Sequence, residues 1–211
     1  YVELLLDTPQ FFTVFWNSCR QVFPIILGHV LLGAPAAWAF AKFHFRGKKI
    51  LYTLYIVLML MPFQVTMVSS YLVLNKLGLI DTVWAVILPG AASTLPVFIM
   101  TRFFMDIPEA AVDGASSFQT FLRFGLPLGA PGILSAVVLG FLEYWNAIEA
   151  PQAFLKNQAL WPLSLYMSNI TADNAGVSLI ASLITLMPPL LIFLSGQKYL
   201  EQGIISSGMK D

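Results

Sequence analysis

The residues best suited to chemistry gather in one apolar stretch: Glu143, Tyr144, Trp145, Asn146 and Glu149. On one continuous helix Glu143 and Asn146 would share a face, as would Trp145 and Glu149, because residues three or four apart are neighbours. A carboxylate and an amide bond hydroxyl groups, and an aromatic ring covers the apolar face of a sugar ring. We predict that these residues line a substrate pathway. The alternative is that the rings pack between helices and Glu143 bonds a neighbouring helix.

Other reactive side chains are few. Cys19 is the only cysteine, and His29 and His44 are the only histidines, which excludes an internal disulfide framework and disfavours a metal cluster. We therefore expect no catalytic residues, no metal site and no cofactor bound by this chain.

The elements that hold these residues are predicted to be membrane spans. Of 211 residues, 58% are hydrophobic and 10% charged, with a formal net charge of zero. Soluble domains carry about 25% charged residues, so the composition indicates an all-α, polytopic membrane protein with a single domain, 1–211. Five stretches are long enough to cross about 30 Å of hydrocarbon. They are residues 17–41, 50–74, 82–104, 130–155 and 178–199.

The ends and connections of these spans orient the chain. Residues 1–15 are apolar but interrupted by charges and a proline, and are predicted to form an interfacial helix and turn. With five spans, eight of the eleven basic residues fall on one side, which the positive-inside rule makes cytoplasmic. They are Lys42, Arg46, Lys48, Lys49, Arg102, Arg123, Lys198 and Lys210. The chain is thus expected to start outside and end in the cytoplasm.

The connection at about 106–127 is more than a loop. Pro108 suits a first helical turn, Gly114 permits a tight turn, and Ser116 or Ser117 can cap a second short helix that runs through Arg123. Leu126-Pro127 is predicted to stop that helix. Two short helices on the cytoplasmic face would expose small alanines beside larger apolar side chains, namely Phe118, Phe121 and Leu122. Such a surface suits docking into a groove of another protein; otherwise it is an amphipathic connector on lipid headgroups.

The order Glu109-Ala110-Ala111, Gly114 and Leu126-Pro127 resembles the EAA loop of ABC importer permeases. Phe124 departs from the aliphatic residue usual before the leucine. Further stretches resemble the carbohydrate branch, specifically the maltose-type second permease subunit. They are Phe45-Arg-Gly-Lys-Lys, Leu77-Gly-Leu-Ile-Asp-Thr, Tyr144-Trp145-Asn146 and Gln197-Lys-Tyr-Leu-Glu-Gln-Gly-Ile.

This resemblance implies the transmembrane domain of a type I ABC importer in a bacterial or archaeal cytoplasmic membrane. Such subunits usually have six spans, so five would mean that one N-terminal span is missing. The implied partners are a second permease, two ATP-binding cassette subunits that hold ATP and Mg, and an external solute-binding protein; no nucleic acid is involved. The residues implied in coupling to the ATPase are Glu109, Ala110, Ala111, Asp113, Gly114, Phe118, Leu126 and Pro127.

Two other functions compete with a sugar importer. An ABC permease for amino acids, peptides or ions would share the EAA loop, and only the tail and Trp145-Asn146 argue against it. A membrane-embedded enzyme would need clustered His, Asp or Glu near one membrane face, whereas here the acidic residues are scattered.

Overall fold

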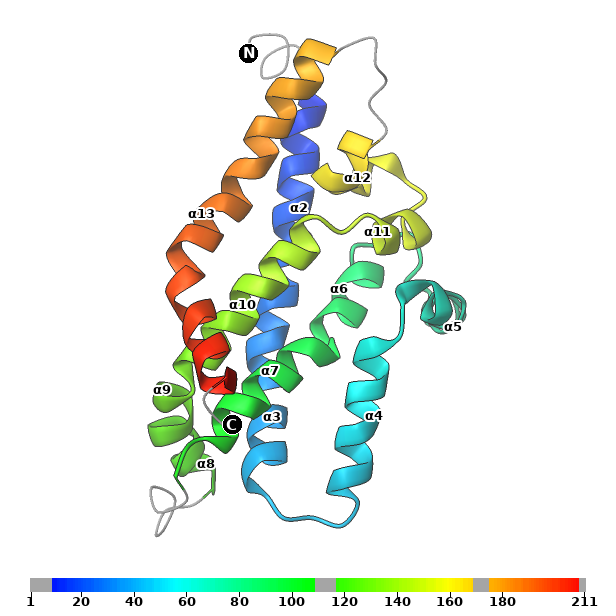
Figure 1. The fold of residues 1–211 in the computed structure, drawn as a ribbon. Helices are drawn as coiled ribbons and strands as arrows, with labels where there is room; N and C mark the ends of the chain where they lie inside the picture. Colours follow the sequence, from blue (N-terminus) through cyan, green and yellow to red (C-terminus); the bar gives the residue numbers. More distant parts are fainter. Residues whose placement is uncertain (1–8, 109–116, 169–174, 209–211) are drawn as a thin grey trace. The chain divides into compact units, whose positions relative to one another are not determined.

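A computed structural model describes residues 9–108, 117–168 and 175–208. These residues are mainly helical, and no strand occurs among them. The helices are α2 (Pro9–Gly28), α3 (Ala34–Lys42), α4 (Lys48–Leu60), α5 (Phe63–Lys76), α6 (Trp84–Ala91), α7 (Thr94–Met105), α8 (Ser117–Thr120), α9 (Leu126–Leu128), α10 (Ala130–Trp145), α11 (Glu149–Phe154), α12 (Leu163–Ser168) and α13 (Ala175–Gly208) (Figure 1). π-Helical turns at His29–Gly33 and Phe121–Gly125 join α2 to α3 and α8 to α9.

Three helical stretches are long and apolar enough to cross a membrane: Gln10–Lys42, Trp84–Met105 and Ala181–Glu201. Two bent helix pairs raise the count to five if each pair is one span. They are Lys48–Leu60 with Phe63–Lys76, and Phe118–Leu128 with Ala130–Trp145. The predicted all-α polytopic fold is confirmed, and five is the upper count among the described residues.

The predicted boundary between an interfacial segment at residues 1–15 and the first span is wrong. Residues 9–15 do not form a separate interfacial element, because α2 begins at Pro9 and runs without a break into the first span. Phe11 and Val14 are buried, which ties this turn into the fold. Residues 1–8 lie outside the described residues.

The fourth predicted span is also shorter than expected. Helix α10 ends at Trp145, and α11 begins at Glu149. Pro151 has no N–H to donate to the carbonyl of Ala147, so one hydrogen bond of a continuous helix is missing here. The Ser164 hydroxyl donates to that carbonyl instead, at 2.6 Å. Trp145 and Glu149 therefore lie on different helices and do not share the expected face.

The predicted stop at Leu126-Pro127 lies one residue too early, because α9 ends at Leu128 and the chain bends by 69° before α10. Helical backbone continues from Ser117 through α9, and Pro127 lies inside it. The π-helical turn just before it lets Leu126 donate to the carbonyl of Phe121, five residues back. This wider turn accommodates the proline that follows. Residues 109–116, the core of the predicted coupling element, lie outside the described residues.

The chain forms two compact units, and every span passes from one to the other. The first unit takes the described residues of Tyr1–Ile25, Pro62–Gly90 and Phe141–Ile192. Its core includes Ile25, Val86, Ile87 and Leu155, with a second cluster of Leu74, Ala85 and Phe154.

The second unit takes the described residues of Ile26–Met61, Ala91–Gly140 and Phe193–Asp211. Helices α3, α4 and α7 lie side by side in it (Figure 1). Its core is one cluster rich in aromatic rings. Its buried members are Ala34, Ala37, Trp38, Phe40, Val97, Met100, Phe104, Ile107, Phe121 and Ala136.

Candidate functional site

The described part of the predicted coupling element separates its apolar side chains into two groups. Phe118 is 70% exposed and Leu122 is 45% exposed, as a docking surface requires. Phe121 is only 7% exposed, so its prediction as an exposed side chain is wrong. The ring of Phe121 instead packs inside the core of the second unit, which fixes the helix that carries Phe118.

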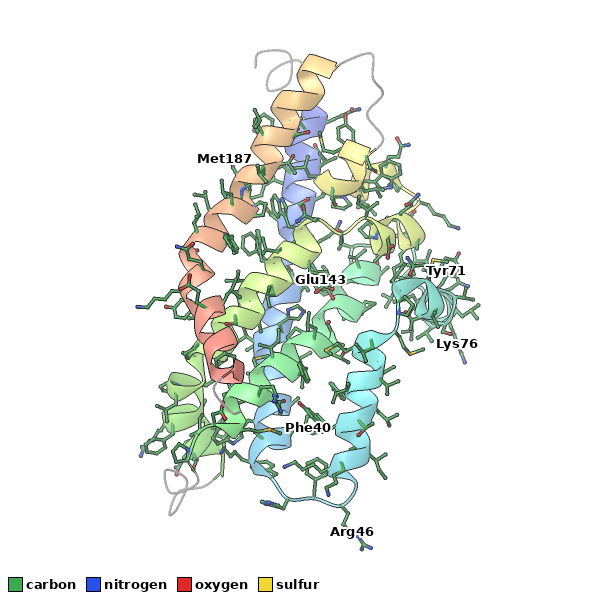
Figure 2. The ribbon with its side chains drawn as sticks, in the orientation of Figure 1. Phe40, Arg46, Tyr71, Lys76, Glu143 and Met187 are labelled. Carbon is green, nitrogen blue, oxygen red and sulfur yellow. The ribbon has the colours of Figure 1, made fainter. Side chains whose placement is uncertain are left out.

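The remaining coupling candidates are placed as follows. Leu126 and Pro127 form the first residues of α9, and Leu126 packs against the core of the second unit. Glu109, Ala110, Ala111, Asp113 and Gly114 lie outside the described residues. In the connection between α3 and α4, Arg46 projects away from the turn (Figure 2).

The pathway candidates divide into exposed polar groups and covered rings. Glu143, Asn146 and Glu149 are exposed, whereas Tyr144 is half-buried and Trp145 is 2% exposed. Glu143 projects from the last turn of α10 (Figure 2). Asn146 donates its side-chain amide to the carbonyl of Leu142 at 2.8 Å, so one of its donors serves the end of its own helix.

Trp145 serves as a structural anchor of the first unit. Its indole stacks on Phe141 at 5.3 Å between centroids and meets the edge of Phe15 at 5.7 Å. Its Nε1 donates to the carbonyl of Thr185 on α13 at 3.1 Å. Tyr144 packs beside Ile25, Val86 and Ile87 in a neighbouring cluster of the same unit. The aromatic members of the predicted pathway are therefore largely taken up by packing.

The structure adds Gln64, a residue that the sequence did not single out. Its side-chain amide on α5 donates to Glu149 Oε1 at 2.7 Å, and both side chains are exposed. Gln64 on α5 and Glu149 on α11 thus add to the exposed Glu143 of α10. The available signal was a glutamine two residues after Pro62 in a largely apolar span.

The connection between α11 and α12 is held tightly within the first unit. Asn17 donates to the carbonyls of Ala159 at 2.7 Å and Trp161 at 3.1 Å, and Gln21 donates to Leu160 at 2.9 Å. Asp81, at a left-handed φ of 63°, accepts from the backbone N–H groups of Lys156 and Asn157. Buried polar groups that bond backbone in this way order the connection.

No group of three His, Cys, Asp or Glu side chains that could hold a metal occurs within residues 9–108, 117–168 and 175–208. The exposed polar candidates are the amides of Gln64 and Asn146 and the carboxylates of Glu143 and Glu149. The neighbouring rings are half-buried in Tyr144 and buried in Trp145. This arrangement can bind a hydroxylated solute through hydrogen bonds; it provides no nucleophile paired with a base.

Comparison with known proteins identifies the class. Residues 29–206 match the family of binding-protein-dependent transport system inner membrane components, and the chain belongs to that family. It is a multi-pass membrane subunit of an ABC transporter.

Two relatives and one solved structure illustrate the similarity. The arabinooligosaccharides transport system permease protein AraQ of Halalkalibacterium halodurans is 24% identical, over 100% of this chain and 78% of the relative. The diacetylchitobiose uptake system permease protein NgcG of Streptomyces coelicolor is 28% identical, over 92% of this chain and 68% of the relative. The fold matches a chain in the crystal structure of a bacterial ABC transporter involved in alginate import, with a TM-score of 0.78 at 20% identity, covering 92% of this chain and 76% of that one.

Proposed function

We propose that this chain is the permease subunit of an ATP-driven importer that moves a carbohydrate delivered by an external solute-binding protein. The observation that carries the proposal is the family match over residues 29–206, together with relatives named for arabinooligosaccharides and diacetylchitobiose. A permease for amino acids, peptides or ions is not favoured by these relatives.

The chain would provide the path and the coupling, while two partner subunits bind and hydrolyse ATP with Mg. A second permease would complete the path. Glu143, Asn146 and Glu149, with Gln64, are the open polar groups that could bond sugar hydroxyls on this side of the path. Trp145 would hold α10 to α13 rather than contact solute, because its indole is covered and its N–H is already bonded.

The substrate class can be tested with the whole complex in proteoliposomes that enclose ATP. Uptake is measured for arabinotriose, diacetylchitobiose, glutamine and a dipeptide, with the cognate binding protein outside. We expect uptake of a carbohydrate only when ATP is hydrolysable. Uptake of glutamine or the dipeptide, with neither sugar transported, would replace the carbohydrate assignment by the amino acid or peptide alternative.

The coupling role of segment 106–127 predicts the effect of a bulky residue at Gly114. Gly114→Phe should lower transport by about tenfold, within the range of a coupling free energy of about 1–3 kcal/mol, while the chain still inserts into the membrane. ATP hydrolysis and uptake are measured on the same vesicles. A matched control is Leu60→Phe, which adds a ring at a side chain that is 72% exposed. Transport at the parental rate in Gly114→Phe would contradict the docking assignment.

A further inference from the structure

The turn between α3 and α4 carries a basic surface directly beyond the end of a membrane span. The candidate span Gln10–Lys42 ends where this turn begins, so residues 43–49 lie at the boundary between hydrocarbon and water. Four of the eight residues 42–49 are Lys or Arg, and no Asp or Glu occurs between Asp7 and Asp81. This segment of the second unit therefore carries positive charge that its own sequence does not neutralise.

Two of the four basic groups hold the turn in place. Lys42 donates to the carbonyl of Ile107, just beyond the end of α7, and Lys48 donates to the carbonyl of Phe43 at 3.0 Å. Asp106 directly precedes Ile107, so the acidic group at the end of α7 belongs to the surroundings of Lys42. These two lysines are therefore occupied with the protein itself.

Arg46 and Lys49 are the basic groups of the turn that remain open. Both side chains are exposed, and Arg46 projects away from the turn (Figure 2). Within residues 9–108, 117–168 and 175–208, neither side chain has a hydrogen bond or an ion pair. A planar guanidinium suits the oxygens of a phosphate, and an ammonium adds a compact charge. The open groups thus fit an anionic phosphate ligand.

Helix α4 adds an apolar face that begins at the basic groups. No residue of α4 is buried, and Ile50, Leu54 and Val57 are exposed at spacings of four and three residues, which places them on one stripe. The rings of Phe43 and Phe45 are also exposed in the turn, as is common for apolar side chains at a membrane interface. Charge and apolar stripe follow each other in the order of a lipid headgroup and its chain.

We propose that the turn between α3 and α4 binds an anionic phospholipid, with its phosphate on Arg46 and Lys49 and an acyl chain along the exposed stripe of α4. Phosphatidylcholine has the same phosphate but adds a cation that these residues repel, so the site favours phosphatidylglycerol. A lipid covers the charges and the stripe as one molecule, whereas an ATP-binding subunit outside the hydrocarbon covers only the charges. The site uses no residue of the proposed substrate pathway or coupling element.

The test places a fluorophore on α4 next to the site. Thr53, exposed and one turn after Lys49, is changed to cysteine in a Cys19→Ser background and labelled with bimane in the assembled transporter. Phosphatidylcholine vesicles receive increasing fractions of phosphatidylglycerol or phosphatidylcholine that carries a nitroxide near the headgroup end of its chain. Quenching against lipid fraction gives a relative association constant, which we expect to be about tenfold higher for phosphatidylglycerol.

Matched variants assign that preference to the two open groups. Arg46→Gln with Lys49→Gln should remove it, whereas Arg46→Lys with Lys49→Arg, which keeps both charges, should retain most of it. Lys76→Gln with Lys156→Gln removes two exposed charges from the first unit and should leave the preference unchanged. Only monodisperse protein is reconstituted. Arg46→Gln alone alters one exposed turn residue and should lower the preference partway, so it stays informative if the double variant fails to fold.

Three results would overturn the inference. The first is equal quenching by the two lipids in the parental chain, or an unchanged preference in Arg46→Gln with Lys49→Gln. The second is loss of the preference in potassium phosphate but not in KCl of equal ionic strength, which would make free phosphate the ligand. The third is loss of the ATP-binding subunits from the double variant with its lipid preference intact, which would make the turn a protein contact. None of these measures transport, so the carbohydrate assignment is tested separately.

Discussion

At the scale of single residues, Gly28 and Ala91 show how closely helices of the second unit approach. A Cβ on Gly28 would lie 2.5 Å from the Cβ of Ala91. Gly28→Ala should therefore destabilise the chain by about 1–3 kcal/mol through overpacking. The double variant Gly28→Ala with Ala91→Gly should recover most of that loss, because it moves the methyl group to the other helix. Thermal unfolding of the purified protein in one detergent measures both.

The single variant Ala91→Gly is the control for this exchange. It should cost little more than the lower helix propensity of glycine, about 1 kcal/mol. Equal melting temperatures for Gly28→Ala and the double variant would mean that the approach of these two residues does not limit stability.

Residue type predicted which side chains matter, but not which way they face. Phe118 and Phe121 are the same residue type three positions apart, yet one is 70% exposed and the other 7%. The difference arises because Trp38 and Phe104 surround Phe121 from elements distant in sequence. Trp145 was likewise a candidate for solute contact by type, and its partners Phe15 and Thr185 come from α2 and α13.

At the scale of elements, prolines leave particular backbone carbonyls without a helical hydrogen bond, and other side chains donate to those carbonyls. Pro189 cannot donate to the carbonyl of Thr185, four residues earlier in α13, and the indole of Trp145 donates to it instead. Pro151 likewise cannot donate to the carbonyl of Ala147, and the hydroxyl of Ser164 donates to that carbonyl instead. In hydrocarbon, each freed carbonyl needs such a donor.

This role predicts a specific outcome for Trp145→Phe. The ring is kept and the donor is lost, so the carbonyl of Thr185 is left without its cross-helix bond, at a cost of about 1–3 kcal/mol in unfolding free energy. Unfolding in detergent should show the loss, while the apparent KM for sugar uptake by the assembled complex should stay at the parental value.

Ser164→Ala is the matched comparison, because it removes the donor to the other freed carbonyl and touches no pathway candidate. Both variants should be destabilised to a similar extent with KM unchanged. If KM rises in Trp145→Phe and not in Ser164→Ala, Trp145 takes part in binding the substrate and its role is not only structural.

At the scale of the whole molecule, the uneven placement of basic residues predicts orientation. Single cysteines are placed at the exposed positions His44, Asn75 and Gln158, in a Cys19→Ser background. In intact cells a membrane-impermeant maleimide should label His44→Cys only after permeabilisation, because it lies beside Arg46, Lys48 and Lys49. Asn75→Cys and Gln158→Cys should be labelled directly. The reverse labelling pattern would show that the chain has the opposite orientation in the membrane.

The sequence by itself determined the all-α membrane class and the family. These follow from local features: long apolar runs and a motif with fixed spacing. Only the tertiary structure decided that α10 ends at Trp145, that α2 begins at Pro9, and that Phe121 and Trp145 are buried while Phe118, Glu143 and Asn146 are open. Burial and hydrogen bonding depend on which distant elements meet. The ring of Trp38, the hydroxyl of Ser164 and the carbonyl of Thr185 have partners that local spacing does not connect to them.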